Sequence, residues 1–274
     1  MPPFTSSTEA VERTGGGSSS WAVPDAITLA KDFAAAFIAS TALSIPVTII
    51  DKAVVENATG ANTLGASMRT ALVKLLTTPH KFLTSREYFV VHGVYTATYL
   101  AANWTDSVCE ASSRSNKIPK LASTTLVNLG AAASKDRIFG IWFSGKPPAP
   151  FPLVSWSLFF VRDLGTMATA FSLPPAISQS MVERDYSPST AKYVSQIAPV
   201  MAIQWLTVPL HLIAYDLYVH KLGSGRTAPD RLAFLRQKYT ETVGARSMRI
   251  FPAFGLGGLG NTWLRNALLG KPQE

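Results

Sequence analysis

The chain has 274 residues, of which 47% are hydrophobic and only 15% are charged, and its formal net charge is +8. Soluble domains carry about 25% charged residues, so this composition favours a membrane protein with several spans. The excess of Lys and Arg suits contact with anionic lipids or an acidic solute. Because the basic residues are scattered between apolar runs, nucleic acid is excluded as the favoured partner. The single cysteine, Cys109, excludes an internal disulfide and any site with several thiolate ligands.

Residues 1–25 predict a flexible polar tail, because Ser and Gly dominate its centre. The tail carries Glu9 and Glu12, whereas cleaved organelle transit peptides are poor in acidic residues. It also lacks the apolar core of a signal peptide. We therefore expect no cleavable presequence, and we place a membrane domain at residues 26–270.

Six segments of this domain predict membrane helices, because a bilayer span needs about 20 mostly apolar residues. Their approximate bounds are residues 27–50, 87–105, 119–143, 153–182, 192–219 and 247–266. The uncharged part of the third is short, Leu121–Ser134, so this helix either continues through residues 135–137 or only dips into the bilayer. Prolines inside the spans predict kinks, since proline removes a backbone hydrogen bond. They are Pro46, Pro174, Pro175 and Pro209.

The fourth span, Leu153–Val182, organises the chain, because its only charges are the adjacent Arg162 and Asp163. Charges inside a membrane are costly and usually functional. Neighbouring helix positions point about 100° apart, so we expect these two to scarcely neutralise each other and to seek partners on other helices. In a transporter, Arg162 suits a carboxylate or phosphate of the solute, and Asp163 locks a neighbouring helix. His211, near the end of the fifth span, is the third candidate for substrate binding.

Two connections predict short amphipathic helices on the membrane surface. The first has an apolar face that includes Met68 and Leu75, and the second opens at Pro229 and has a face that includes Leu232 and Tyr239. Basic residues are more numerous in the connections after the first, third and fifth spans than elsewhere. The rule of positive inside loops then places both termini on the outer side.

The last span contains Gly255-Leu-Gly257-Gly258-Leu-Gly260, which matches the dinucleotide fingerprint GxGxxG by letter only. That fingerprint needs a preceding strand and an acidic residue about 20 positions further on, and the sequence offers neither. Glycines at this density in an apolar helix instead predict a close approach of two backbones.

A threefold pattern links the odd-numbered spans, each of which has an acidic residue near its inner end with basic residues beside or near it. The acidic residues are Asp51, Asp136 and Asp216, and the basic residues that we group with them are Lys52, Lys135 and Arg137. Pro46 and Pro209 precede two of the three positions. This pattern resembles the mitochondrial carrier superfamily. The resemblance implies an all-α bundle of six tilted helices in three two-helix repeats, with surface helices and an ion-pair network that closes the inner side of a cavity. It also implies a mitochondrial membrane, with the inner favoured over the outer.

No catalytic constellation competes with this interpretation. The four histidines lie far apart in sequence, no serine stands in a Gly-x-Ser-x-Gly elbow, and no Cys/His cluster has metal-ligand spacing. We therefore expect no enzyme, no metal and no cofactor. Two function classes remain: a transporter of a small anionic solute, and a non-transporting protein that shapes membranes, docks or serves as a subunit of a complex. The expected partners are the lipid bilayer, including anionic lipids, and the solute if the protein is a transporter; the sequence identifies no particular protein partner.

Overall fold

The computed structural model describes residues 21–145, 150–221 and 225–272, without the side chains of residues 171, 172 and 254–256. All regular secondary structure in these ranges is helical, so the predicted all-α class is confirmed. The helices are α1 (Ala26–Thr59), α2 (Leu64–Thr77), α3 (Pro79–Leu83), α4 (Arg86–Ala111), α5 (Lys117–Phe143), α6 (Leu153–Val182), α7 (Pro188–Ala202), α8 (Gln204–Val219), α9 (Ala228–Ile250), the π-helix η1 (Phe251–Leu259) and α10 (Gly260–Leu269).

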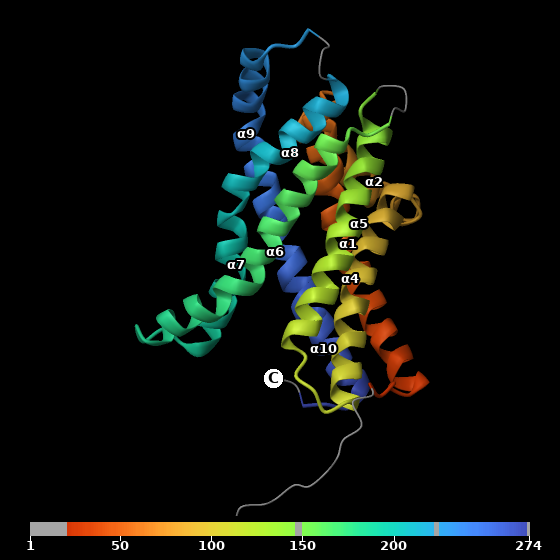
Figure 1. The fold of residues 1–274 in the computed structure, drawn as a ribbon. Coiled ribbons are helices and arrows are strands. Elements are labelled where there is room, and N and C mark those ends of the chain that lie inside the picture. The colour runs from red at the N-terminus through yellow and green to blue at the C-terminus, as the bar shows by residue number, and fades with distance from the viewer. Residues whose placement is uncertain (1–20, 146–149, 222–224, 273–274) are drawn as a thin grey trace, which may run out of the picture.

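The long helices run roughly along one direction, and both described ends of the chain lie at the same end of the bundle (Figure 1). α1 packs against α4 and α10, α4 against α5, and α6 against α7 and α8. The largest apolar core joins α1, α4, α5, α6 and α8. Its fully buried members include Leu43, Val91, Phe139, Phe159 and Leu212.

Large apolar side chains also cover the outer surface of the bundle. They include Phe37 on α1, Leu126 on α5, Val161 on α6, Leu206 on α8 and Trp263 on α10. Exposed apolar residues on every long element suit contact with lipid, in which helices satisfy their own backbone hydrogen bonds. By length and apolarity alone, two helical stretches in the described ranges meet the requirements of a membrane span, Ala26–Thr59 and Pro188–Val219.

The predicted third span is one continuous helix. α5 has 27 residues and runs without a break through Lys135, Asp136 and Arg137. At the helical rise it is about 40 Å long, so the helix does continue through residues 135–137. Each proline expected to kink a span lies inside a helix that continues past it, in α1, α6 and α8.

The predicted fifth span is divided, which corrects the expectation of a single helix. α7 ends at Ala202 and α8 begins at Gln204, with Ile203 between them. Pro199 lies one turn before this break, and α7 continues past it.

The two predicted surface helices differ in outcome. α2 is a separate helix beside the bundle, whereas α9 continues directly through η1 into α10, so the second surface helix is not separate (Figure 1). Thr227 and Asp230 form a capping box at the start of α9, and the hydrogen bonds from Thr227 lower the pKa of Asp230. No proline follows this start until Pro252, which lies in the first turn of the π-helix, so nothing ends the helix earlier.

At the glycine-rich segment, where the sequence predicts a close approach of two backbones, the atoms nearest to Gly257 belong to side chains of α1 and α4. A Cβ atom there would lie 1.9 Å from the Tyr99 hydroxyl oxygen and 2.7 Å from Leu43 Cδ2. The Tyr99 hydroxyl donates a hydrogen bond of 3.0 Å to the Ala253 carbonyl of the same segment. Only a residue without a side chain fits between α1 and α4 at this position.

Candidate functional site

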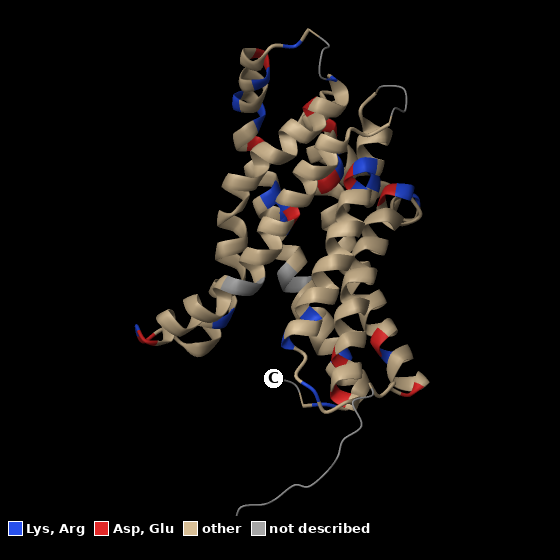
Figure 2. Ribbon diagram, viewed as in Figure 1, with Lys and Arg blue, Asp and Glu red and all other residues tan. Residues whose placement is uncertain are grey.

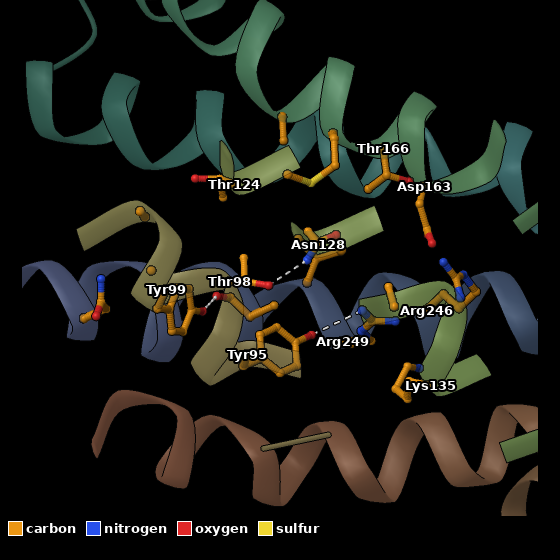
Figure 3. Close-up of a pocket in the computed structure, with 18 of the residues that line it drawn as sticks. Tyr95, Thr98, Tyr99, Thr124, Asn128, Lys135, Asp163, Thr166, Arg246 and Arg249 are labelled. Carbon is orange, nitrogen blue, oxygen red and sulfur yellow. Dashed lines mark hydrogen bonds between the residues drawn. The ribbon is translucent and has the colours of Figure 1, made fainter. Parts of the chain in front are cut away.

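A cavity of about 300 Å³ lies between α4, α5, α6 and the continuous α9–η1–α10 segment, which suits a small solute (Figure 3). Tyr95, Tyr99 and Thr98 of α4 form one wall, and Thr124 and Asn128 of α5 form another. Charged side chains of α5, α6 and α9 gather at one end of the cavity. In Figure 3 Asp163, Arg246 and Lys135 lie toward this end, and Tyr99 and Thr124 lie toward the other.

The charged end is built around ion pairs that we call the central ion-pair cluster. It consists of Asp51, Lys135, Asp136, Arg162, Asp163 and Arg249. Lys135 Nζ lies 2.6 Å from Asp51 Oδ2 and 2.7 Å from Asp136 Oδ1. Arg249 Nη1 lies 3.2 Å from Asp51 Oδ1. The cluster therefore ties α1, α5 and α9 together, and it needs all its partners because a buried charge without one is costly.

Arg162 joins α6 to this cluster. Its Nη1 lies 2.6 Å from Asp136 Oδ2, and its Nε and Nη2 donate to Asp163 at 2.8 and 2.6 Å. The expectation that Arg162 and Asp163 would scarcely neutralise each other is thus wrong. The side chain of arginine is long enough to fold back onto the next residue, although the two Cβ atoms point in different directions.

His211 of α8 lies beside Arg162, with its Nδ1 2.6 Å from Arg162 Nη1. The imidazole is 1% exposed and does not line the cavity, and its Nε2 has no partner among the described residues. Of the three predicted substrate-binding residues, Arg162 and Asp163 therefore border the cavity, and His211 lies behind them.

A second set of polar contacts closes the opposite end of the bundle, near the chain ends, and we call it the terminal clasp. It consists of Asp32, Ser107, Glu110, Arg265 and Lys271. Arg265 Nε donates to Asp32 Oδ1 at 2.8 Å, and the Ser107 hydroxyl donates to Asp32 Oδ2 at 2.6 Å. Asp32 is fully buried, so the clasp joins α1, α4 and α10 through a charge that lies out of water.

The exposure of the lining side chains shows where the cavity opens. The side chain of Lys120, near the start of α5, is 39% exposed, whereas those of Asp136 and Arg162 are 3% and 2% exposed. Lys120 lies at the end of α5 that is close to the chain ends, where the α6–α7 hairpin points away from α10 (Figure 1). The cavity thus opens toward the chain ends and is closed by the central ion-pair cluster.

Comparison with known proteins places this site in a family. The family whose sequence model matches residues 35–269 is described as "Probable citrulline exporter". The chain belongs to this family. The match includes the cavity and the central ion-pair cluster, and the family's description is that of a transporter-like membrane protein. No curated protein and no solved structure matches the sequence.

Membership in the citrulline exporter family overturns the resemblance to the mitochondrial carrier superfamily, which was wrong. The threefold pattern behind it also has no common centre in the structure. Asp216 pairs with Arg226 at 3.2 Å and with Arg231, because it lies in the last turn of α8 and faces the start of α9. Lys52 pairs with glutamates of α1 and α4, and Arg137 is exposed.

Half of the predicted network does converge, namely Asp51, Lys135 and Asp136. Sequence reasoning missed Arg246 and Arg249, which stand at the border between the last connection and the sixth predicted span. Their spacing of three places both on one face of a helix, and that signal was available in the sequence. Nothing local in the sequence marks Gln204, whose side-chain oxygen accepts a 3.0 Å hydrogen bond from Arg246 Nε.

Metal ligands do not gather at this site. Within the described ranges, no group of three or more His, Cys, Asp or Glu side chains is placed to hold a metal ion. The side chains that border the cavity offer ion pairs, hydroxyls and amides.

Proposed function

We propose that the protein exports citrulline, or a small amino acid of similar polarity, through the cavity between α4, α5, α6 and α9–α10. The observation that carries this proposal is a cavity of about 300 Å³ that is bordered by polar groups and closed at one end by buried ion pairs. The family description supports export as the direction of transport and an amino acid as the class of solute. A polar solute needs such hydrogen-bonding groups, because it leaves its water shell on entering the membrane.

In this proposal the central ion-pair cluster is the gate. Asp51, Lys135 and Asp136 hold α1 against α5, and Arg162 holds α5 against α6. Opposite charges attract strongly in a site that excludes water, so the closed end is stable until the helices separate. Release of the solute at that end requires these pairs to exchange partners while the other end closes.

The proposed membrane arrangement has six crossing segments within residues 26–270, formed in three consecutive pairs by α1, α4, α5, α6, α7–α8 and α9–α10. The exposed apolar residues on these elements support it. Their charged residues lie mainly toward the helix ends and in a group near the middle of the bundle (Figure 2). The mitochondrial location followed from the overturned resemblance, and cell fractionation tests it separately.

The experiment is uptake of labelled citrulline into liposomes that contain the purified protein. We expect uptake by the wild type and none by protein-free liposomes. Asn128→Trp places a large ring in the cavity wall and should abolish uptake, whereas Leu126→Trp on the same helix points outward and should retain it, because Leu126 is 70% exposed. A wild type that moves neither citrulline nor related amino acids contradicts the proposal and favours a structural or docking protein.

A further inference from the structure

The charges around the closed end of the cavity do not balance. Four cationic side chains meet there, and only three carboxylates accompany them. The cations are Lys135, Arg162, Arg246 and Arg249, and the carboxylates are Asp51, Asp136 and Asp163. Every one of these groups has an ion pair within the described residues except Arg246. The cavity wall therefore carries one positive charge in surplus.

Arg246 is held in place without being neutralised. Its side chain is buried, and Nε donates to Gln204 Oε1 at 3.0 Å. Gln204 is itself 1% exposed and is fixed by a 3.1 Å hydrogen bond from its Nε2 to the Val200 carbonyl. The two terminal nitrogens of Arg246 make no hydrogen bond to the described residues and stay accessible from the cavity.

A buried guanidinium with free terminal nitrogens is an unusual arrangement in a stable fold, because a buried charge without a partner is destabilising. The same arrangement suits an anionic group that arrives from the cavity. Two parallel N–H donors match the two oxygens of a carboxylate, and such charge-assisted pairs are short and strong.

Near its middle, the cavity has polar side chains and, among the described residues, no additional unpaired charge. The Thr124 hydroxyl has no partner among the described residues, and the Asn128 amide donates to Thr98 at 3.3 Å, which leaves its carbonyl oxygen without a bond there. These groups lie on the next wall, away from Arg246 along the cavity (Figure 3). A solute with a carboxylate at one end and an uncharged polar group at the other fits this order.

We infer that Arg246 is the anchor for the carboxylate of the transported amino acid, with Gln204 as its positioning residue. The inference rests on the proposed function for the identity of the solute and names the residue that would select amino acids over the amides in which the carboxylate is replaced. Arg162 instead belongs to the gate, because both terminal nitrogens of Arg162 already pair with carboxylates.

The test compares two ligands and two arginines in the purified full-length protein. The ligands are L-citrulline and its carboxamide, which lacks only the carboxylate. The variants are Arg246→Gln and Arg236→Gln; Arg236 lies on the same helix and is exposed. Binding is measured by calorimetry and by the shift in unfolding temperature, so no transport step is needed.

We expect Arg246→Gln and the loss of the carboxylate each to weaken binding about 30-fold, as for one charge-assisted pair. The two losses should not add, because they remove the same contact. Arg236→Gln should bind both ligands as the wild type does, and Arg246→Lys should retain part of the preference for the carboxylate. If Arg246→Gln does not fold, Arg246→Lys and the ligand comparison in the wild type carry the test.

Equal losses for citrulline and its carboxamide in Arg246→Gln, or no loss for either, would overturn the anchor. If the wild type does not bind citrulline, the proposed solute is wrong, and acetate, lactate and glycine then serve as probes. Stabilisation by these carboxylates that depends on Arg246 supports the anchor, and its absence overturns it. An equal effect of inorganic phosphate also overturns it, since the site would then hold any anion.

Discussion

Asp136 is the most heavily engaged carboxylate of the central ion-pair cluster. Its Oδ1 accepts from Lys135 at 2.7 Å, and its Oδ2 accepts from Arg162 at 2.6 Å. All three side chains are at most 4% exposed, so water cannot replace a lost partner. The same burial that makes the pairs strong therefore makes each of them hard to remove singly.

We predict that Asp136→Asn lowers the free energy of unfolding by about 3–5 kcal/mol, because it leaves two buried cations underpaired. Thermal unfolding in detergent measures the loss. Asp185→Asn is the matched control, since Asp185 lies exposed in the turn between α6 and α7 and should change stability little. Equal stability of the two variants would show that water enters the cluster and that it is no closed gate.

At the residue scale, the sequence was informative where a few charges stood within or at the end of an apolar run. Arg162 was identified because it and Asp163 are the only charges of their span, and Asp51 and Asp136 because acidic residues recur near the inner ends of the odd-numbered spans. The choice of partner was not predictable, since a flexible arginine reaches several carboxylates and only the packed helices decide among them. Arg246 escaped notice because it stands among other basic residues of α9, which resemble a solvated surface.

The π-helix η1 packs against side chains of two other helices. Gly257 lies against Tyr99 of α4 and Leu43 of α1, and the Tyr99 hydroxyl donates to the carbonyl of Ala253 in the same element. Gly260 opens α10 only three residues later, and a Cβ atom there meets nothing within 4 Å. The two glycines therefore form a matched pair in one segment.

We predict that Gly257→Ala destabilises the protein by about 1–3 kcal/mol, because the new methyl group displaces the Tyr99 ring. Gly260→Ala should be neutral or slightly stabilising, since alanine is the better helix former. Unfolding midpoints of both variants provide the comparison. Adding Tyr99→Phe to Gly257→Ala should recover part of the loss, and no recovery would mean that Leu43 sets the limit instead.

At the scale of elements, starts of helices were more predictable than their ends. Asp230 and Pro229 mark the start of α9 by a capping box and a proline in the first turn, and both signals are local. The continuation of α9 into η1 and α10 has no local signal, because it depends on packing along the whole bundle. The break at Ile203 is the reverse case, because the sequence predicted a kink at Pro209 and the span is instead divided before that proline.

The terminal clasp determines how the molecule holds together as a whole. Arg265 is the only residue of α10 that pairs with Asp32 in the described structure, and it also donates to the Ser107 hydroxyl at 2.8 Å. Lys271 contributes to the same end by pairing with Glu110 at 2.6 Å, but both of those side chains are largely solvated. The clasp thus has a buried part and an exposed part.

We predict that Arg265→Ala costs about 3–5 kcal/mol, because it leaves Asp32 as a buried charge without a cation. Lys271→Ala should cost less than about 1 kcal/mol, as expected for an exposed pair. Hydrogen exchange should show faster exchange along α10 in the first variant only. Slow exchange in both would indicate that the packing of α10 on α1 suffices without the ion pair.

The clasp has a consequence for the order of the helices along the chain. α1 and α10 pack against each other and are joined by the ion pair between Asp32 and Arg265. The helices therefore form a closed ring in which the first and last described helices are neighbours. The packing of the helices then does not depend on which two neighbours in the ring the chain leaves unconnected. A circularly permuted chain, joined through residues 1–25 and opened at the exposed turn that contains Asp185, keeps every interhelical contact of the original and differs only in where synthesis begins.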